Sequence, residues 1–194
     1  LGLLLCQNSL LERTKKMTVY GPRGSRGKIH SLLHDSFFRP EKLSYKLKIT
    51  NIKPGRSYSE ALIKVTFFET RHLEQARLKR HFGKKATACG MVVDGPGWRI
   101  VYSGDNQSPA ELAPYVKNCD LLIHELAHHP PEAVAEFAAA AEIPHVLISH
   151  IGPEFDKSPD KIETVFAKYY SGDLIIARDG TKVSLSRATI RSPA

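Results

Sequence analysis

The chain has 194 residues, of which 42% are hydrophobic and 25% are charged, and these values exclude a disordered or fibrous protein. Its three cysteines are far apart and form no CxxC pair, which excludes a disulfide scaffold and a zinc ribbon and indicates a reducing, cytoplasmic compartment. The opening run LGLLLC is too short for a membrane helix, which needs about 20 apolar residues, so we expect no membrane segment.

The net charge of +8 is unevenly distributed along the chain. Residues 1–99 contain 20 Lys and Arg against 7 Asp and Glu, whereas residues 100–194 contain 8 against 13. Clustered basic residues attract polyanions, because counterions are released when these residues meet phosphates. We therefore expect a phosphate-bearing substrate, either RNA or a small phosphodiester, although a solvated lysine-rich face gives the same pattern.

The first part of the chain mixes short helices with strands. The leucine spacing predicts a helix over residues 2–12, and MTVY predicts a strand over 17–20. A glycine-rich turn at 21–27 leads into a short helix. Two further strands are expected at 45–52 and 61–68, joined by the turn KPGRS.

The later part alternates strands with helices. Proline and an early acid after a serine, as in SPAE, are typical of a helix start. Such a mixture predicts layered α and β structure in a single domain over residues 1–194. The expected elements are a hairpin of strands 86–94 and 98–105, a helix over 108–116, a strand over 119–125, a helix over 130–142, a strand over 145–150, a helix over 158–169 and a closing hairpin of 174–180 with 181–186.

Four apolar strands stop at residues that can bind a metal. Imidazole nitrogens and carboxylates are natural ligands of zinc and manganese. A single histidine at a strand end is more often a hydrogen-bonded structural residue, but four such motifs in one chain favour a shared metal site. The motifs are ETRH (69–72), YSGD (102–105), IHELAHH (123–129) and LISH (147–150).

These motifs and their neighbours resemble the metallo-β-lactamase superfamily, and within it the ribonuclease Z-like branch. The resemblance implies an α/β fold, the αββα sandwich. The superfamily signature HxHxDH is absent from the sequence, so we expect a domain that lacks its first strands at the N-terminus. The segments that carry the resemblance are TVYGPRG (18–24), YSGD (102–105), LLIHE (121–125), HHPPEAVAEFA (128–138), LISHIGPEF (147–155) and ARDG (177–180).

The resemblance also implies the metal ligands. His72 would bind the first metal, Asp105 would bridge the two metals, and His150 would bind the second. His72 directly follows the strand that ends in ETRH, which is where the family places this ligand. His81, nine residues further along, is the alternative ligand at this place.

A pair of residues near the scissile bond follows from the same resemblance. Glu125 and His128 would form a catalytic dyad in which His128 donates a proton to the leaving oxygen. Aligning His128 with the family's histidine keeps its spacing to His150 without a gap. His129 is the alternative proton donor and needs a shift of one residue.

The function implied is metal-dependent hydrolysis of phosphodiester bonds, with two zinc ions in the complete site and manganese as the alternative ion. A dinuclear site needs about three protein ligands per ion, so we expect the 194 residues alone to be inactive or impaired. Relatives are commonly dimers, which implies a homodimer. Two other hypotheses are a metal-free binding protein on the same fold and a metallo-hydrolase of another ester or a thioester.

Overall fold

The computed structural model describes residues 2–35, 39–75, 78, 80–81, 86–186 and 189–191. Contacts between residues divide the chain into two compact units, Leu1–Lys53 and Pro54–Ala194. Each unit is described separately below. The expectation of a single domain over residues 1–194 stays a prediction beside this division.

The first unit contains two short strands that pair in parallel. Parallel strands cannot be joined by a tight turn, and here α2 forms part of the crossover between them. The helix predicted over residues 2–12 and the strand predicted over 17–20 are confirmed, with ends that differ by two residues or fewer. The elements are α1 (Gly2–Leu10), β1 (Met17–Gly21), α2 (Ser25–Asp35), the 3-10 helix η1 (Pro40–Lys42) and β2 (Leu47–Asn51).

A small core holds this first unit together. Leu5, Ile29 and Leu33 are buried and come from the two α-helices. The strand side chains that pack against them are two residues apart, as one face of a strand requires. They are Met17 and Val19 in β1, and Leu47 and Ile49 in β2.

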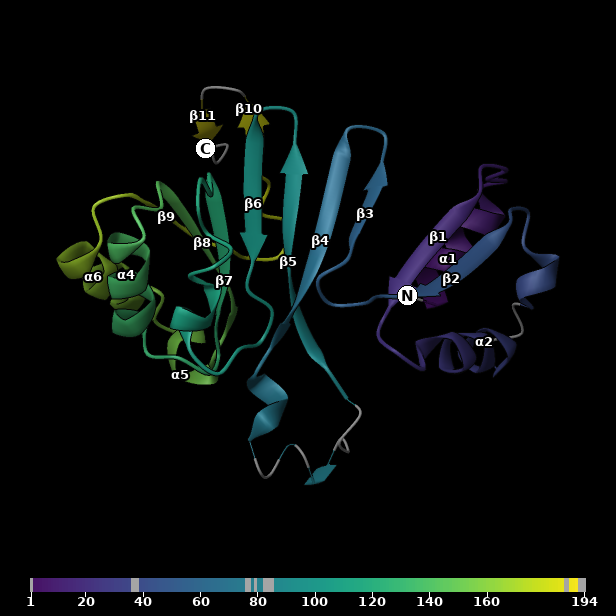
Figure 1. Cartoon of the computed structure of the whole chain (residues 1–194), viewed down its shortest axis with the longest axis horizontal. Coiled ribbons are helices and arrows are strands. Elements are labelled where there is room, and N and C mark those ends of the chain that lie inside the picture. Colours follow the sequence, from purple (N-terminus) through teal and green to yellow (C-terminus); the bar gives the residue numbers. More distant parts are fainter. Residues whose placement is uncertain are drawn as a thin grey trace. The chain divides into compact units, whose positions relative to one another are not determined.

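The second unit is built on a seven-stranded mixed sheet whose strands follow their order in the chain (Figure 1). The first pairings, from β3 to β6, are antiparallel, and those from β6 to β9 are parallel. The strands are β3 (Ser57–Glu60), β4 (Ile63–Thr70), β5 (Ala88–Gly95), β6 (Trp98–Tyr102), β7 (Leu121–Leu126), β8 (His145–Ile151) and β9 (Asp173–Ile176).

The strand directions decide where the polar motifs meet. Since β5 is antiparallel to both β4 and β6, β4 runs in the same direction as β6. The strands β7, β8 and β9 continue in that direction. Five strands therefore end at one edge of the sheet, and the predicted site motifs follow four of them.

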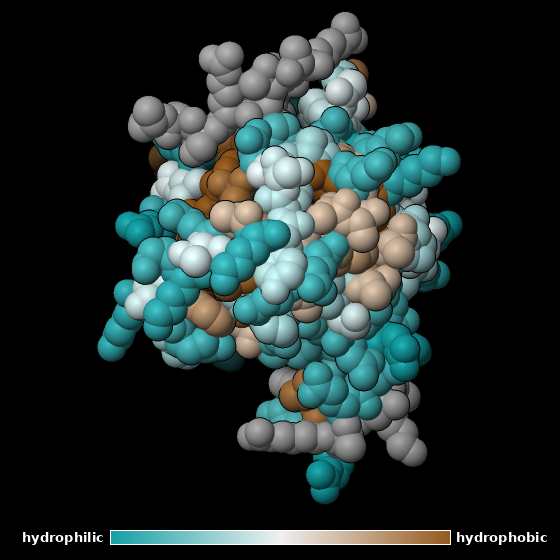
Figure 2. Space-filling model, turned by 90° about the vertical axis from the view of Figure 1, so that its left-hand side faces the viewer, coloured by the Kyte–Doolittle hydropathy of each residue, from teal (hydrophilic) through white to brown (hydrophobic). Residues whose placement is uncertain are grey.

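Helices α4 and α6 lie beside β7, β8 and β9 and close the core on that side (Figure 1). Val134 of α4 and Phe166 of α6 are buried against Leu122 and Val146 of the strands. On the outside of this part of the unit, hydrophilic side chains cover most of the face shown in Figure 2. The helical elements and the terminal strands are η2 (His72–Glu74), η3 (Pro109–Leu112), α4 (Pro131–Ala140), α5 (Pro153–Asp156), α6 (Asp160–Tyr169), β10 (Ser184–Ser186) and β11 (Thr189–Arg191).

None of the helices in the described ranges combines the length and the apolar character needed to cross a membrane.

The layered α/β class is confirmed, but three local predictions are wrong. The turn predicted at KPGRS (53–57) does not extend to its last residue, because Ser57 begins β3, a strand that was not predicted. The helix expected over 108–116 is a 3-10 helix of four residues, because Pro114 has no backbone N–H to continue a helix. The closing hairpin does not form: β9 pairs with β8 in parallel, and β10 pairs with β11 instead.

Candidate active site

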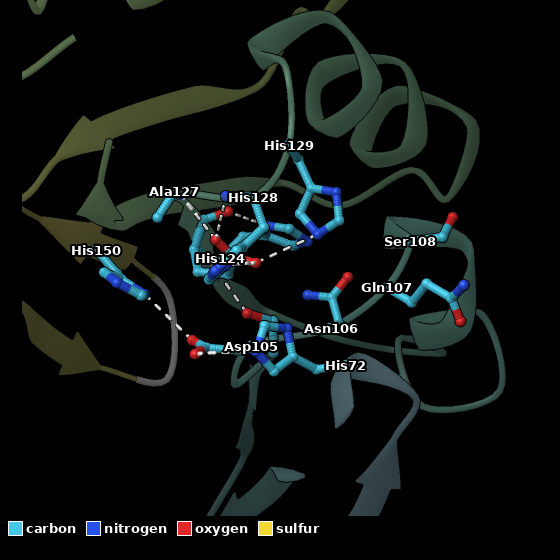
Figure 3. A network of polar contacts seen from close by, with 12 residues as sticks. His72, Asp105, Asn106, Gln107, Ser108, His124, Ala127, His128, His129 and His150 are labelled. Carbon is cyan, nitrogen blue, oxygen red and sulfur yellow. Dashed lines mark hydrogen bonds and ion pairs between the residues drawn. The ribbon is translucent and has the colours of Figure 1, made fainter. Parts of the chain in front are cut away.

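The edge at which the strands end gathers histidine and carboxylate side chains from four segments (Figure 3). His72 lies in η2 after β4, and Asp105 follows β6. Glu125 is the penultimate residue of β7, and His150 is the penultimate residue of β8. The residues that the sequence analysis selected are therefore brought together by parallel strand ends.

Asp105 lies between the two histidines expected to bind metal. Its Oδ1 atom is 3.1 Å from Nδ1 of His150. Its Oδ2 atom is 4.0 Å from Nε2 of His72. One carboxylate thus faces both imidazoles, which is the arrangement that a bridging ligand between two metal positions needs.

Backbone geometry fixes Asp105 at this place. Gly104 adopts a φ of +58°, a left-handed conformation that favours glycine, and a Cβ there would collide with the carbonyl group of Cys89. The Thr70 hydroxyl at the end of β4 donates to the backbone carbonyl oxygen of Asp105. The turn that carries Asp105 is therefore held by two neighbouring strands.

His150 is turned toward the site by a β-bulge. Glu125 pairs with Ser149, but the next residue of β7, Leu126, pairs with Ile151, so His150 has no partner in the ladder. Its φ of +47° is left-handed, which is rare for a residue with a side chain. Bulges are over-represented near active sites because they redirect a side chain, and this one points the imidazole of His150 at Asp105.

Glu125 is buried, and four groups surround its carboxylate. Its Oε2 atom accepts hydrogen bonds from the backbone N–H groups of Ala127 at 2.8 Å and His128 at 3.0 Å. Its Oε1 atom is 3.1 Å from Nδ1 of His128 and 3.3 Å from Nε2 of His129. The carboxylate is thus held in place and fixes the His128 ring.

These contacts keep Glu125 ionised. Burial is the largest single influence on the pKa of Glu125, and it raises this pKa. Four other effects lower the pKa and together outweigh burial: the contact with His129, the charges of His128 and His129, and the backbone amide of His128. The pKa of Glu125 therefore falls to about 2. A carboxylate that stays negative can hold a proton on Nδ1 of His128. The other ring nitrogen of His128 is then left to face a substrate.

The exposure of their side chains distinguishes the two candidate proton donors, His128 and His129. The His128 side chain is 35% exposed, and its ring lies 4.6 Å from that of His72 and 5.5 Å from that of His150, between centroids. The His129 side chain is only 7% exposed and points inward, with its ring 5.5 Å from that of His124. The geometry supports His128, and its catalytic role stays a prediction.

Two groups of three side chains could hold a metal ion, each with its ligand atoms within 4.8 Å of one another. One is His72, Asp105 and His128, and the other is Glu125, His128 and His150. Among the described residues, which include His81, no such group contains His81. His72 is therefore supported over its alternative, although its role as a ligand stays a prediction.

The donor set fits a divalent metal of the zinc or manganese type, since imidazole and carboxylate suit both ions. Nδ1 of His72 is buried and has no hydrogen-bond partner within the described ranges. Glu125 is a poor ligand, because both of its oxygens already have two contacts each. His72, Asp105 and His150 are therefore the side chains best placed for metal, whereas Nδ1 of His128 is held by Glu125.

Glu111 shapes the site although it lies outside the four predicted metal-binding motifs. Glu111 accepts from the backbone N–H groups of Gln107 at 2.9 Å and Ser108 at 3.1 Å through one oxygen, and from Arg71 at 2.8 Å through the other. It thereby ties the loop after Asp105 to the residue before His72. The SPAE pattern predicted its capping contact with Ser108, but not the contact with Arg71.

A family model identifies the chain. Residues 4–151, more than half of the chain, match the β-lactamase superfamily domain. The chain therefore belongs to the β-lactamase superfamily, as its motifs predicted.

Among curated proteins, the chain is similar to the ribonuclease Z of Haloferax volcanii. The two are 22% identical over 229 residues, an alignment that covers 91% of this chain and 71% of that protein. Several Pseudomonas putida proteins of the same name are covered over only 35% to 42% of their length.

Solved structures show which fold this is. The chain is similar to the metallo-β-lactamase fold protein YhfI of Bacillus subtilis, with a TM-score of 0.70, 17% identity and coverage of 99% of this chain and 71% of that one. It is also similar to the Zn²⁺-bound PqqB of Methylobacterium extorquens, with a TM-score of 0.60, 15% identity and coverage of 91% and 67%. The predicted metallo-β-lactamase fold is confirmed.

Proposed function

We propose that this protein is a metal-dependent hydrolase that cleaves phosphodiester bonds, with RNA as its substrate. The observation that carries the proposal is the position of His128. Its ring lies beside those of His72 and His150, and its Nδ1 atom is 3.1 Å from the ionised Glu125 carboxylate. A proton donor held between two metal-binding side chains suits the departure of an alkoxide.

In this proposal His72, Asp105 and His150 hold two divalent ions, with zinc as the first candidate and manganese as the second. The imidazole and carboxylate donors and the similarity to the Zn²⁺-bound PqqB support zinc. Bound ions supply Lewis-acid stabilisation of the charge that develops on the phosphoryl oxygens. His128 delivers a proton to the leaving oxygen, and Glu125 keeps the ring of His128 oriented through its contact with Nδ1.

RNA is the proposed substrate for two reasons. The curated relatives at 22% to 28% identity are named ribonuclease Z, apart from one named ribonuclease BN at 24% identity. Residues 1–99 carry 20 basic side chains against 7 acidic ones, which suits a polyanion. A small phosphodiester uses the same chemistry and is the second candidate substrate. We also propose that the protein forms a homodimer and acts in the cytoplasm.

With Asp105 shared, the three proposed ligands His72, Asp105 and His150 give each of two ions two protein ligands, where about three are needed. We therefore retain the proposal that the 194 residues by themselves are impaired, and that the activity belongs to a form with further ligands. Metal content tests this part directly. Elemental mass spectrometry on a sample of verified mass should give about two ions per chain only where further ligands are present.

Hydrolysis is tested on the metal-loaded protein with bis(p-nitrophenyl) phosphate and with an RNA that carries a 3′ extension. Asp105→Ala should lower both the metal content and the turnover, the latter by roughly 100-fold or more, because it removes the carboxylate that faces both histidines. Asp160→Asn is the control, since Asp160 is exposed in the first turn of α6. Undiminished turnover by Asp105→Ala would show that the assignment is wrong.

The same assays separate the competing functions. Cleavage of a thioester without cleavage of either phosphodiester would identify a metallo-hydrolase of another class. An absence of turnover by the fully metal-loaded protein on all three substrates would favour a binding protein on this fold.

A further inference from the structure

A cavity of about 350 Å³ lies beside His150 at the same sheet edge. It is bounded by the end of β8, by the residues around α5, and by the segment that follows β9. Pockets for small molecules occupy about 300–1,000 Å³, so this one is large enough for a bound group rather than for water alone. The hydrolytic chemistry proposed above uses His150 but none of the other walls.

The walls combine an apolar surface with two opposite charges. Five of the eight lining residues are apolar, Phe155, Pro159 and Ile176 among them. The charged members are Arg178 and Asp179, both exposed. Within the described ranges, no ion pair involves either of these two side chains. Both charged groups are therefore available to a ligand.

The charged wall is fixed to the strand that carries His150. The Ala177 N–H donates to the carbonyl oxygen of Ile148 at 2.9 Å, which extends the pairing of β9 with β8. Arg178 N–H then donates to the Thr181 hydroxyl at 2.8 Å, and Thr181 N–H donates to the Arg178 carbonyl oxygen at 2.9 Å. Gly180, with a φ of +88°, allows this tight turn. The cavity is therefore largely preformed.

This combination of walls selects one kind of ligand. Apolar walls and an aromatic ring suit a flat heterocycle, because every base offers an apolar face for stacking. A guanidinium is the side chain of choice for phosphate oxygens. The Asp179 carboxylate would repel a second phosphate, but it can accept hydrogen bonds from the amino groups of a base. A nucleotide can interact with the apolar surface, with Arg178 and with Asp179, whereas inorganic phosphate can interact favourably only with Arg178.

We propose that this cavity binds the nucleotide that adjoins the scissile phosphodiester, with the base against Phe155 and the guanidinium of Arg178 on a phosphate oxygen. This inference rests on the proposed function, since it names the group that stands next to the bond to be cleaved. Because His150 is both a wall of the cavity and the partner of Asp105, a nucleotide bound here lies beside the metal-binding side chains. Arg178 is then a specificity-determining residue.

Binding is tested without turnover. Calorimetry on the EDTA-treated protein compares adenosine 5′-monophosphate and uridine 5′-monophosphate with ribose 5-phosphate, which has no base. The nucleotides should bind about tenfold more tightly or better, because stacking of the base is lost in ribose 5-phosphate. Equal affinity for nucleotides and ribose 5-phosphate would overturn the proposal.

Three variants locate the binding. Arg178→Gln should weaken nucleotide binding by about tenfold or more through loss of a charge-assisted contact. Phe155→Leu preserves much of the packing and should reduce the preference for nucleotides over ribose 5-phosphate. Lys168→Gln removes an equal charge from an exposed position of α6 and should leave binding unchanged. Equal losses in Arg178→Gln and Lys168→Gln would place the nucleotide elsewhere.

A separate assay with methyl p-nitrophenyl phosphate and added metal keeps the two proposals apart. Nucleotide binding that depends on Arg178, without cleavage of any phosphodiester by the fully metal-loaded protein, would support the cavity and refute the hydrolase. Cleavage without Arg178-dependent nucleotide binding would support the hydrolase and refute the cavity.

Discussion

The Nδ1 atom of His150 lies 3.1 Å from Oδ1 of Asp105, although the two residues are 45 positions apart in the chain. The contact depends on two irregular backbone positions. Gly104 turns the chain directly before Asp105, and the bulge in β8 takes His150 out of its ladder. The geometry of the proposed metal site is thus specified by backbone conformation as much as by the side chains.

The left-handed backbone of His150 leads to a stability prediction. Its φ is +47°, which costs about 1–2 kcal/mol for a residue with a Cβ. We expect His150→Gly to relieve this cost and His150→Val, which is β-branched, to increase it. Urea unfolding should place His150→Val roughly 1–2 kcal/mol below His150→Gly, while both lose metal binding. Equal stability of the two variants would mean that the bulge rearranges when the side chain changes.

Glu125 should affect turnover more than metal binding. In Glu125→Gln the negative charge beside Nδ1 of His128 is lost, so the ring is no longer held by a carboxylate in the orientation proposed for proton donation. We expect kcat to fall by roughly 10²–10⁴-fold, with metal content close to that of the unaltered protein. Glu136→Gln, at an exposed position of α4, is the matched control. A large loss of metal in Glu125→Gln would instead identify Glu125 as a ligand.

The pKa of Glu125, about 2, also predicts part of the pH profile. This carboxylate is ionised at every pH above about 4, so it produces no acid limb in that range. An acid limb near neutrality should therefore come from a group other than Glu125, and its apparent pKa should persist in Glu136→Gln. An apparent pKa between 4 and 5 that disappears only in Glu125→Gln would contradict this reasoning.

His124 should make the fold sensitive to acid. Its side chain is fully buried, and this burial lowers the pKa to about 4, below the value of 6.5 expected in the unfolded chain. Above pH 6.5 both states are neutral and His124 contributes no pH dependence. As the pH falls from 6.5 to 4, only the unfolded chain gains the proton, so the free energy of unfolding should fall by up to about 3 kcal/mol.

The contribution of His124 is measured as a difference between two proteins. Urea unfolding of the unaltered protein and of His124→Gln, at several pH values between 4 and 7, gives the two slopes. The slope of the variant should be smaller, because its amide does not titrate. Parallel slopes would assign the acid sensitivity to other histidines.

Gly104 should tolerate no side chain. Its φ of +58° and the nearby Cys89 carbonyl group predict that Gly104→Ala destabilises the fold by roughly 1–3 kcal/mol and weakens metal binding through Asp105. Gly27→Ala is the control, because Gly27 lies within α2 and a Cβ there meets nothing within 4 Å. Gly27→Ala should be neutral or stabilising in the same thermal unfolding assay. A similar loss in both variants would contradict a specific constraint at Gly104.

The sequence could predict which side chains gather at the sheet edge, because most of them lie at the ends of apolar strands. His72, Asp105 and Glu125 each come at or just after the end of an apolar run, and strands that run in one direction bring their ends to one edge. The β8 bulge at His150 was not predictable, because it depends on the register between β7 and β8. The pairing of β9 with β8 was missed for a related reason: ARDG followed by a polar strand is also the pattern of a hairpin, and only tertiary packing decides between the two partners.

Glu111 holds two loops of the site together, although it is not one of the proposed metal ligands. One partly exposed side chain accepts hydrogen bonds from the backbone of three residues in two loops, those that contain Arg71 and Gln107. Glu111 therefore influences the distance between the segments of His72 and Asp105, although these three hydrogen bonds involve neither of those residues. A neutral change at Glu111 would leave every ligand in the sequence intact and still allow the two loops to drift apart, so a complete ligand set is not by itself evidence of a working centre.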